Sequence, residues 1–105
     1  MEIKYKSVDD TLYANLSGEL DEYTAEYVRM SLDTICKDLT AISPASLVLD
    51  FSDVTFMDST GIGVLLGRYN KFSKNNISIS IRNAKGHVDR ILKMTGIYEI
   101  MPKIS

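Results

Sequence analysis

The sequence has one cysteine, one histidine, two prolines and no tryptophan among its 105 residues. A lone cysteine, Cys36, excludes an internal disulfide framework and a zinc site built from several cysteines. Cys36 lies beside the apolar positions of a predicted helix, which favours a small core side chain over a reactive thiol. The fold must therefore be stabilised by a hydrophobic core, and a chain of this length is large enough for one.

The sequence also lacks an excess of one charge and any long apolar run. The net charge of −2 argues against nucleic acid or an anionic membrane as the main partner. The apolar runs are too short to span a bilayer, and residues 1–6 lack the apolar centre of a signal peptide. We therefore expect a cytoplasmic globular domain, and the apolar content of 45% is typical of one.

Alternating apolar and polar residues open the chain. They predict a β-hairpin with strands at Ile3–Ser7 and Leu12–Leu16, a polar turn at 8–11, and a loop at Gly18–Asp21 that ends it. Helical spacing then predicts a helix from Tyr23 to Leu39, followed by a break from Ala41 to Ala45. The nearly continuous apolar run Leu47–Phe51 predicts a short strand that is buried on both faces.

The second half continues the alternation of helices and strands. The helix after Ser59 is expected to pack one face against the core, and the side chains of this inward stripe are Ile62, Leu65, Leu66, Tyr69 and Phe72. The remaining expected elements are a strand at Ile77–Ile81, a helix at His87–Thr95 stopped by Gly96, and a short last strand at Tyr98–Met101. The order ββαβαβαβ predicts an α/β domain with a mixed, mostly parallel sheet and helices packed on it.

A possible modification site stands where the strand at 47–51 gives way to the next helix. Asp58 is a good N-cap because its carboxylate can accept hydrogen bonds from the first free N–H groups of the helix. Ser59 then falls in the first turn, with its hydroxyl directed outward at the positive end of the helix dipole. A hydroxyl in this position is a plausible site for adding and removing a phosphate. The alternative is that 58–60 serve only as a cap.

Five acidic residues are predicted to share one end of the sheet, because loops that follow parallel strands lie on one side. We call them the acidic rim: Glu19, Asp21, Glu22, Asp53 and Asp58. One interpretation is a set of solvated loop carboxylates with little burial. The other is a surface complementary to a basic patch on a partner.

Three glycines, Gly61, Gly63 and Gly67, superficially resemble a dinucleotide-binding pattern. They are predicted to lie inside the helix, however, rather than in a phosphate-binding turn. Small residues there allow close approach of a backbone, either to the sheet or to another protein. Gly63 and Gly67 fall outside the inward stripe, so they leave a strip without side chains that suits a docking partner.

Two enzyme-like interpretations fail on the residues they would need. A serine hydrolase needs a strained turn and a histidine base, but Ser59 lacks the preceding glycine and His87 opens a different helix, where we expect a surface residue. A phospho-accepting receiver at Asp50 needs further acidic residues nearby to hold magnesium, and Asp9 and Asp10 lie in a turn at the far end. No metal, cofactor or catalytic residue is predicted.

Residues 49–69, LDFSDVTFMDSTGIGVLLGRY, closely resemble the signature of the anti-sigma factor antagonists, which are small stand-alone STAS domains. Residues 18–21 with 24–26 resemble the first loop and helix start of that family, and 90–92 with 95–97 resemble its last helix and strand. The Gly-Arg-Tyr at 67–69 is most similar to the sporulation branch, the antagonists of anti-sigma F factors.

The resemblance implies a partner-switching mechanism. The unphosphorylated antagonist would bind an anti-sigma factor that is also a serine kinase, and so free a sigma factor. The kinase would phosphorylate Ser59 and a serine phosphatase would reverse this. Residues expected at the partner interface are Glu19, Asp21, Asp58, Ser59, Thr60, Gly61, Gly63 and Gly67. No nucleic acid or membrane is expected as a partner, and the free protein is expected to be a monomer.

The same resemblance leaves two matters open. The family usually has a further C-terminal helix, so we expect residues 1–105 to form a single STAS domain that lacks this helix or is truncated before it. The rival functions are a STAS subunit of another regulatory or transport complex and a small nucleotide-binding domain. Nucleotide titration separates the last of these, because a pure partner switch would bind nucleotide weakly and not turn it over.

Overall fold

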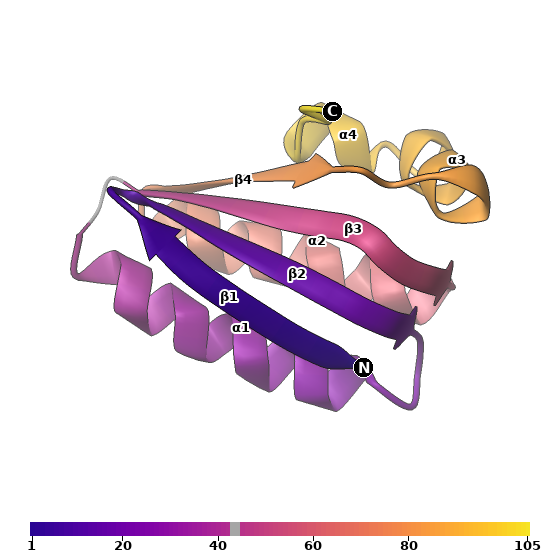
Figure 1. Ribbon diagram of the computed structural model, residues 1–105, viewed down its shortest axis with the longest axis horizontal. Coiled ribbons are helices and arrows are strands. Elements are labelled where there is room, and N and C mark those ends of the chain that lie inside the picture. Colours follow the sequence, from indigo (N-terminus) through magenta and orange to yellow (C-terminus); the bar gives the residue numbers. More distant parts are fainter. Residues whose placement is uncertain (43–44) are drawn as a thin grey trace.

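The computed structural model describes residues 1–42 and 45–105. Its elements are, in order, β1 (Glu2–Val8), β2 (Thr11–Leu20), α1 (Ala25–Thr40), β3 (Ala45–Met57), α2 (Ser59–Lys74), β4 (Ile77–Arg82), α3 (Gly86–Met94) and α4 (Ile97–Ile100). These strands form one sheet in the order β1-β2-β3-β4 (Figure 1). The predicted break at 41–45 follows the end of α1, and its residues 43 and 44 lie outside the described part.

The opening hairpin is confirmed. β1 and β2 are antiparallel, and their last pair, Val8 and Thr11, encloses a two-residue turn. Asp9 in this turn has a φ of 56°, the left-handed conformation that tight hairpin turns need and that aspartate tolerates. β2 continues to Leu20, however, so the loop predicted to begin at Gly18 starts later.

β3 lies parallel to both β2 and β4, which confirms the mixed and mostly parallel sheet. One face of the sheet carries the core, with Leu12, Leu47 and Ile79 among its buried side chains. α1 and α2 cover that face, while α3 and α4 lie on the β4 side (Figure 1). The prediction that 47–51 is buried on both faces is confirmed in part. Val48, on the face opposite Leu47 and Leu49, is only 6% exposed, whereas Asp50 on that same face is half-buried.

β3 is much longer than predicted, since it runs to Met57 and replaces the loop expected after Phe51. Its second half pairs with β2 through two register shifts, so that Asn15 faces Asp50 while Leu20 faces Met57. β3 therefore holds two extra residues over this stretch, and such bulges bend a strand and increase its twist. The bent end of β3 directs the chain into α2.

The inward stripe of α2 is partly confirmed. Ile62, Leu65 and Phe72 are buried, and Tyr69 packs against the core. Leu66 is 43% exposed, contrary to the prediction, while Val64 is buried instead. The reason is that α2 packs through its 61–65 side against the end of the sheet, which turns Leu66 outward.

The C-terminal region forms a helix at 86–94 as predicted, but the expected last strand is wrong. Residues 97–100 form a helical turn, and Ile97 and Met101, four residues apart, both enter the core. The strand-like contact comes later, where Ile81 accepts a hydrogen bond from Ile104 N and donates one to Pro102 O, each 2.9 Å long. The alternation of Tyr98 with Ile100 thus concealed a helical spacing.

Asp89 on α3 fastens this C-terminal segment. Its Oδ1 accepts hydrogen bonds from the Tyr98 hydroxyl at 2.6 Å and from the Lys103 ammonium at 2.9 Å. The hydrogen bond from Tyr98 is the main cause that lowers the pKa of Asp89, with that from Lys103 second. Burial, and then the hydrogen bond to Asp89, raise the pKa of Tyr98. Both shifts favour the hydrogen-bonded pair at neutral pH.

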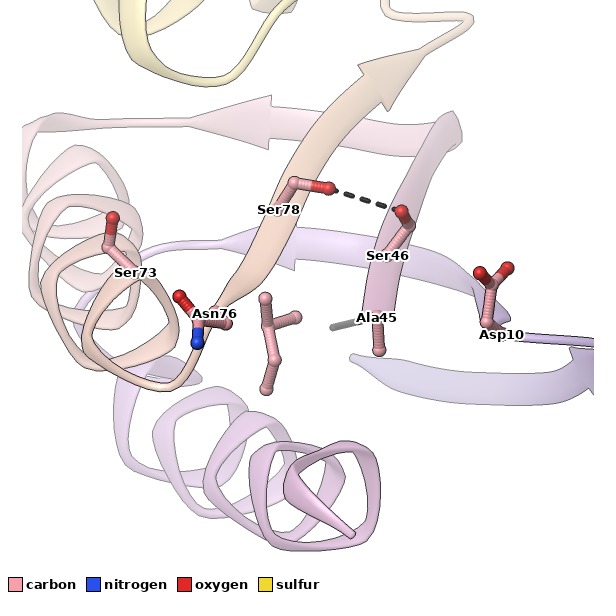
Figure 2. A pocket seen from close by; sticks show the side chains of 7 residues that line it. Asp10, Ala45, Ser46, Ser73, Asn76 and Ser78 are labelled. Carbon is pink, nitrogen blue, oxygen red and sulfur yellow. Dashed lines mark hydrogen bonds between the residues drawn. The ribbon is translucent and has the colours of Figure 1, made fainter. Parts of the chain in front are cut away.

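The end of the sheet where β3 and β4 begin is hollowed by a pocket of about 440 Å³ (Figure 2). It is lined by Asp10, Ala45, Ser46, Ser73, Asn76, Ile77 and Ser78. The hydroxyls of Ser46 and Ser78 lie 3.1 Å apart across the two strands, the contact dashed in Figure 2. This pocket lies at the opposite end from Ser59.

Candidate functional site

The junction of β3 and α2 has the predicted cap. Asp58 is extended, with φ −126° and ψ −172°, and its Oδ1 accepts a hydrogen bond from Gly61 N at 3.1 Å. Its carbonyl accepts the first helical bond, from Ile62 N at 3.1 Å. Two backbone groups at the start of α2 are thereby satisfied without any contribution from the next residue, Ser59.

Ser59 is therefore free for another role. It is the first residue of α2, it is exposed, and its hydroxyl makes no hydrogen bond with another described residue. The positive end of the helix dipole lies beneath it, and this favours negative charge. The geometry suits the addition of a phosphate, which the neighbouring N–H groups would stabilise.

The loop after β2 lies beside this junction, because Leu20 pairs with Met57 and each is followed by an aspartate. Asp21 differs from the expected solvated carboxylate, since only 8% of it is exposed. Its Oδ1 accepts hydrogen bonds from Tyr23 N at 2.9 Å and Thr24 N at 3.2 Å. The Asp21 side chain therefore shapes the turn into α1, whereas the side chains of its exposed neighbours Glu19 and Glu22 make no hydrogen bond or ion pair with a described residue.

Gly61 joins the two loops. A Cβ at this position would lie 2.6 Å from the carbonyl oxygen of Leu20, a distance that real Cβ atoms essentially never show. The absence of a side chain thus lets the first turn of α2 rest directly on the end of β2. Gly61 thus allows close approach of the helix to the sheet, and not to another protein.

Gly63 and Gly67 differ from Gly61. A Cβ at either position would meet nothing within 4 Å, so neither glycine is required by packing inside the domain. Both lie on the outward part of α2, as the sequence predicted. The strip beside Ser59 is therefore open to another molecule.

His87 makes a contact that the sequence did not indicate. Its Nε2 lies 3.1 Å from the carbonyl oxygen of Met57, a hydrogen bond in which the ring nitrogen donates. Its ring also stacks on Phe56, with ring centroids 5.6 Å apart. His87 is exposed, as expected, but it also holds the end of β3 from the side of α3. Only long-range pairing, invisible in a single sequence, could have revealed this.

The model of the STAS domain family matches residues 2–105. The chain belongs to the STAS domain family. The α/β fold class and the family resemblance predicted from the sequence are thereby confirmed. In this STAS domain the match spans β1 through α4, so it includes both loops of the site.

Curated relatives of this STAS domain carry informative names. An anti-sigma F factor antagonist from Paenibacillus polymyxa is 33% identical over 97% of this chain and 85% of the relative. An anti-sigma-B factor antagonist from Bacillus subtilis (strain 168) is 28% identical over 94% of this chain and 86% of the relative. Antagonists of anti-sigma F and of anti-sigma-B factors are therefore both similar to this domain over nearly its whole length.

Solved structures agree on the fold. The anti-sigma factor antagonist SpoIIAA in its unphosphorylated form has a TM-score of 0.75 and 23% identity, covering 99% of this chain and 89% of that one. The Bacillus SpoIIAA in its phosphorylated form has a TM-score of 0.66 and 22% identity, covering 99% and 92%. At these identities the likeness establishes the shared fold.

Asp50 and Asp53 both accept hydrogen bonds in the structure. Burial raises the pKa of Asp50, but hydrogen bonds from Ser52 and Asn83 and the charge of Arg82 outweigh it and lower the pKa overall. Asp53 accepts a hydrogen bond from Asn15 at 3.1 Å. Among the described residues, no group of histidine, cysteine and acidic side chains could hold a metal ion, and no helix has the length and apolarity to cross a membrane.

Proposed function

We propose that this STAS domain is an anti-sigma factor antagonist that is switched by phosphorylation of Ser59. The unphosphorylated form binds an anti-sigma factor with serine kinase activity and thereby frees a sigma factor in the cytoplasm. The kinase then phosphorylates Ser59, and a serine phosphatase restores the binding form. The observation that carries the proposal is the exposed Ser59 hydroxyl at the start of α2, where Asp58 already provides the cap.

The names of the relatives support the regulatory class. Both curated relatives described above are antagonists of anti-sigma factors. SpoIIAA, which shares the fold, exists in phosphorylated and unphosphorylated forms. The sporulation assignment within this class rests on the Gly-Arg-Tyr at 67–69 and remains part of the proposal.

Electrostatics explains why a phosphate would act on binding and not on folding. A phosphate on Ser59 adds about −1.5 to −2 charges at neutral pH. The dipole of α2 favours this charge inside the domain. At an interface the same charge has to be desolvated next to the carboxylate of Asp58, which makes association costly.

The expected interface residues divide into two groups. Glu19, Asp58, Ser59, Thr60, Gly63 and Gly67 are proposed to face the partner. Asp21 and Gly61 contribute indirectly, because one shapes the loop after β2 and the other lets α2 rest on it. The partner surface is thus proposed to be formed by two neighbouring loops and the outward strip of α2.

The test is to incubate the domain with the anti-sigma factor kinase of the same genome and ATP, and to map the modified residue by mass spectrometry. We expect one phosphate, on Ser59, and loss of binding in proportion to its incorporation. The Ser59→Ala variant should keep partner binding and accept no phosphate. Modification of Thr60 in that variant at the wild-type rate would contradict the assignment of the site.

A further inference from the structure

α1 presents large apolar side chains to solvent along one side. Tyr23 just before the helix is 86% exposed, and Met30 within it is 61% exposed, with Tyr27 between them. Their spacing of four and three residues places them on a common face. We call these three residues the α1 stripe. The core is served by another face of the helix, through Val28, Leu32 and Ile35, so packing does not explain the stripe.

Acidic side chains surround the α1 stripe. Glu19, Glu22 and Glu26 are exposed around Tyr23 and Tyr27. Glu26 pairs with Arg29 at 3.5 Å, while Glu19 and Glu22 form no ion pair within the described residues. An apolar strip bordered by unpaired carboxylates has the composition of a contact surface for a basic partner.

The acidic border of the α1 stripe also argues against two other binding partners. A second copy of the chain, facing this one across a two-fold axis, would bring the same carboxylates against each other. An anionic lipid surface would be repelled in the same way. The occupant with the right chemistry is a protein surface that offers an apolar pocket bordered by lysine or arginine.

The α1 stripe and the Ser59 site lie at the same end of the domain. α1 and α2 start from neighbouring strand ends and run side by side (Figure 1). Asp33 braces them, with oxygen-to-nitrogen distances of 3.5 Å to Arg68 and 3.2 Å to Lys71. Gly63 and Gly67 have no side chains that would block the surface of α2. A partner that covers Ser59 can therefore extend across α2 towards α1.

We infer that the α1 stripe anchors the anti-sigma factor kinase, an inference that rests on the function proposed above. The docking surface then has two parts with different tasks. The Ser59 end carries the chemistry of the switch. Tyr23 and Met30 supply the buried apolar contacts that hold the kinase, because aromatic anchors of this kind contribute most to protein interfaces.

The chain offers matched controls for a test. Tyr5 on β1 is 51% exposed and Met94 on α3 is 84% exposed, and both lie outside the α1 stripe. The experiment measures the affinity of the full domain for the kinase by calorimetry, comparing Tyr23→Ala with Tyr5→Ala and Met30→Ala with Met94→Ala. We expect both stripe variants to bind at least about 10-fold more weakly, and both controls to stay within about 2-fold of wild type.

Phosphorylation kinetics give a second readout. The stripe variants should raise the KM for phosphorylation of Ser59 and leave kcat unchanged, because the anchor lies away from the transferred phosphate. Their melting temperatures should match that of wild type, since the side chains are exposed. Equal affinities of stripe and control variants would overturn the inference, as would a fall in kcat at constant KM.

The outcomes separate this inference from the proposed function. If the kinase neither binds nor phosphorylates the wild-type domain, the proposed function fails and the inference falls with it. If wild type is bound and modified on Ser59 but Tyr23→Ala behaves like Tyr5→Ala, only the inference fails. A wild-type dimer in sedimentation that Tyr23→Ala dissociates, or binding to phosphatidylglycerol vesicles that Tyr23→Ala abolishes, would also overturn it.

Discussion

The two ends of the sheet differ in chemistry. At the end where β3 and β4 begin, seven residues enclose a pocket of about 440 Å³, and its few polar contacts include the one between Ser46 and Ser78 (Figure 2). At the other end, Leu20 and Met57 stop side by side and Asp58 caps α2. A hollow is the usual guide to a binding site, but it does not separate the two ends, because a second one of about 540 Å³, lined by Asp53, Thr55 and His87 among others, borders the far half of β3. The ends differ in their residues, and those that suit a regulated contact lie where α1 and α2 begin.

α2 itself joins the two ends and explains part of the difference. Ser59 lies at its first residue, next to the positive end of the helix dipole, and Ser73 lies in its last turn between Lys71 and Lys74. Both serines are exposed. Two equivalent hydroxyls on one helix therefore differ mainly in the backbone and the neighbours that surround them, and this makes the comparison testable.

The largest expected effect comes from charge at these two serines. Ser59→Asp should weaken kinase binding by at least about 100-fold, because an unpaired charge at a desolvated interface costs several kcal/mol. Its stability should rise slightly, by about 0.3–1 kcal/mol, since the dipole favours an anion there. Ser73→Asp should leave binding unchanged. Calorimetric titration and thermal unfolding of both variants provide the measurements.

Two results would break this contrast. A parallel collapse of melting temperature and affinity in Ser59→Asp would mean that the charge acts on folding. Weaker binding of Ser73→Asp by a similar factor would mean that the partner also reaches the pocket end. Either result would require a different interface from the one proposed.

A second contrast lies within α2, between Gly61 and Gly63. Gly61→Ala should destabilise the domain by about 1–3 kcal/mol, because the added Cβ would lie 2.6 Å from the Leu20 carbonyl oxygen. Gly63→Ala meets no atom within 4 Å and should stabilise the helix by about 0.5–1 kcal/mol. Urea denaturation gives both values. Equal signs for the two variants would contradict the close contact of α2 with β2.

These glycines also show what the sequence could and could not predict. Position within a helix is a local property, so the outward placement of Gly63 and the cap at Asp58 were predictable. Which glycine touches the sheet depends on where β2 ends. That end was misplaced, because Gly18 and Glu19 have the composition of a loop, and pairing with β3 overrides it.

The same cause explains the errors in β3 and at the C-terminus. Ser52, Asp53 and Thr55 interrupt the apolar pattern, so the sequence predicted a loop where the bulged half of β3 lies. Ile97 and Met101 lie one helical turn apart, but the alternation of Tyr98 with Ile100 favoured a strand. In both places the deciding interaction joins residues far apart in the chain, which periodicity alone does not detect.

The smallest expected effect compares two aspartates at opposite ends of the sheet. Asp21→Ala should cost about 1–2 kcal/mol, because it removes the acceptor for two N–H groups. Asp10→Ala, in the exposed turn that borders the pocket, should change stability by less than about 0.5 kcal/mol. Chemical denaturation of both variants compares them directly.

Asp21→Asn separates the structural role of Asp21 from a direct contact with the partner. The amide oxygen of asparagine can accept the same two hydrogen bonds, so the fold should be largely restored, while the negative charge is lost. Kinase binding close to wild type would assign Asp21 to shaping the loop. A stable Asp21→Asn variant with greatly reduced affinity would show instead that the charge itself contacts the partner.

The C-terminal segment that Asp89 fastens also affects whether copies of the protein can aggregate through their strand edges. Unpaired strand edges can template aggregation. Along β4, residues 102–105 cover part of the edge, with backbone hydrogen bonds at Ile81 and Asn83. Along β1, Lys4 and Lys6 set like charges near each other when two such edges meet. Both edges thus oppose fibril-like stacking of free copies.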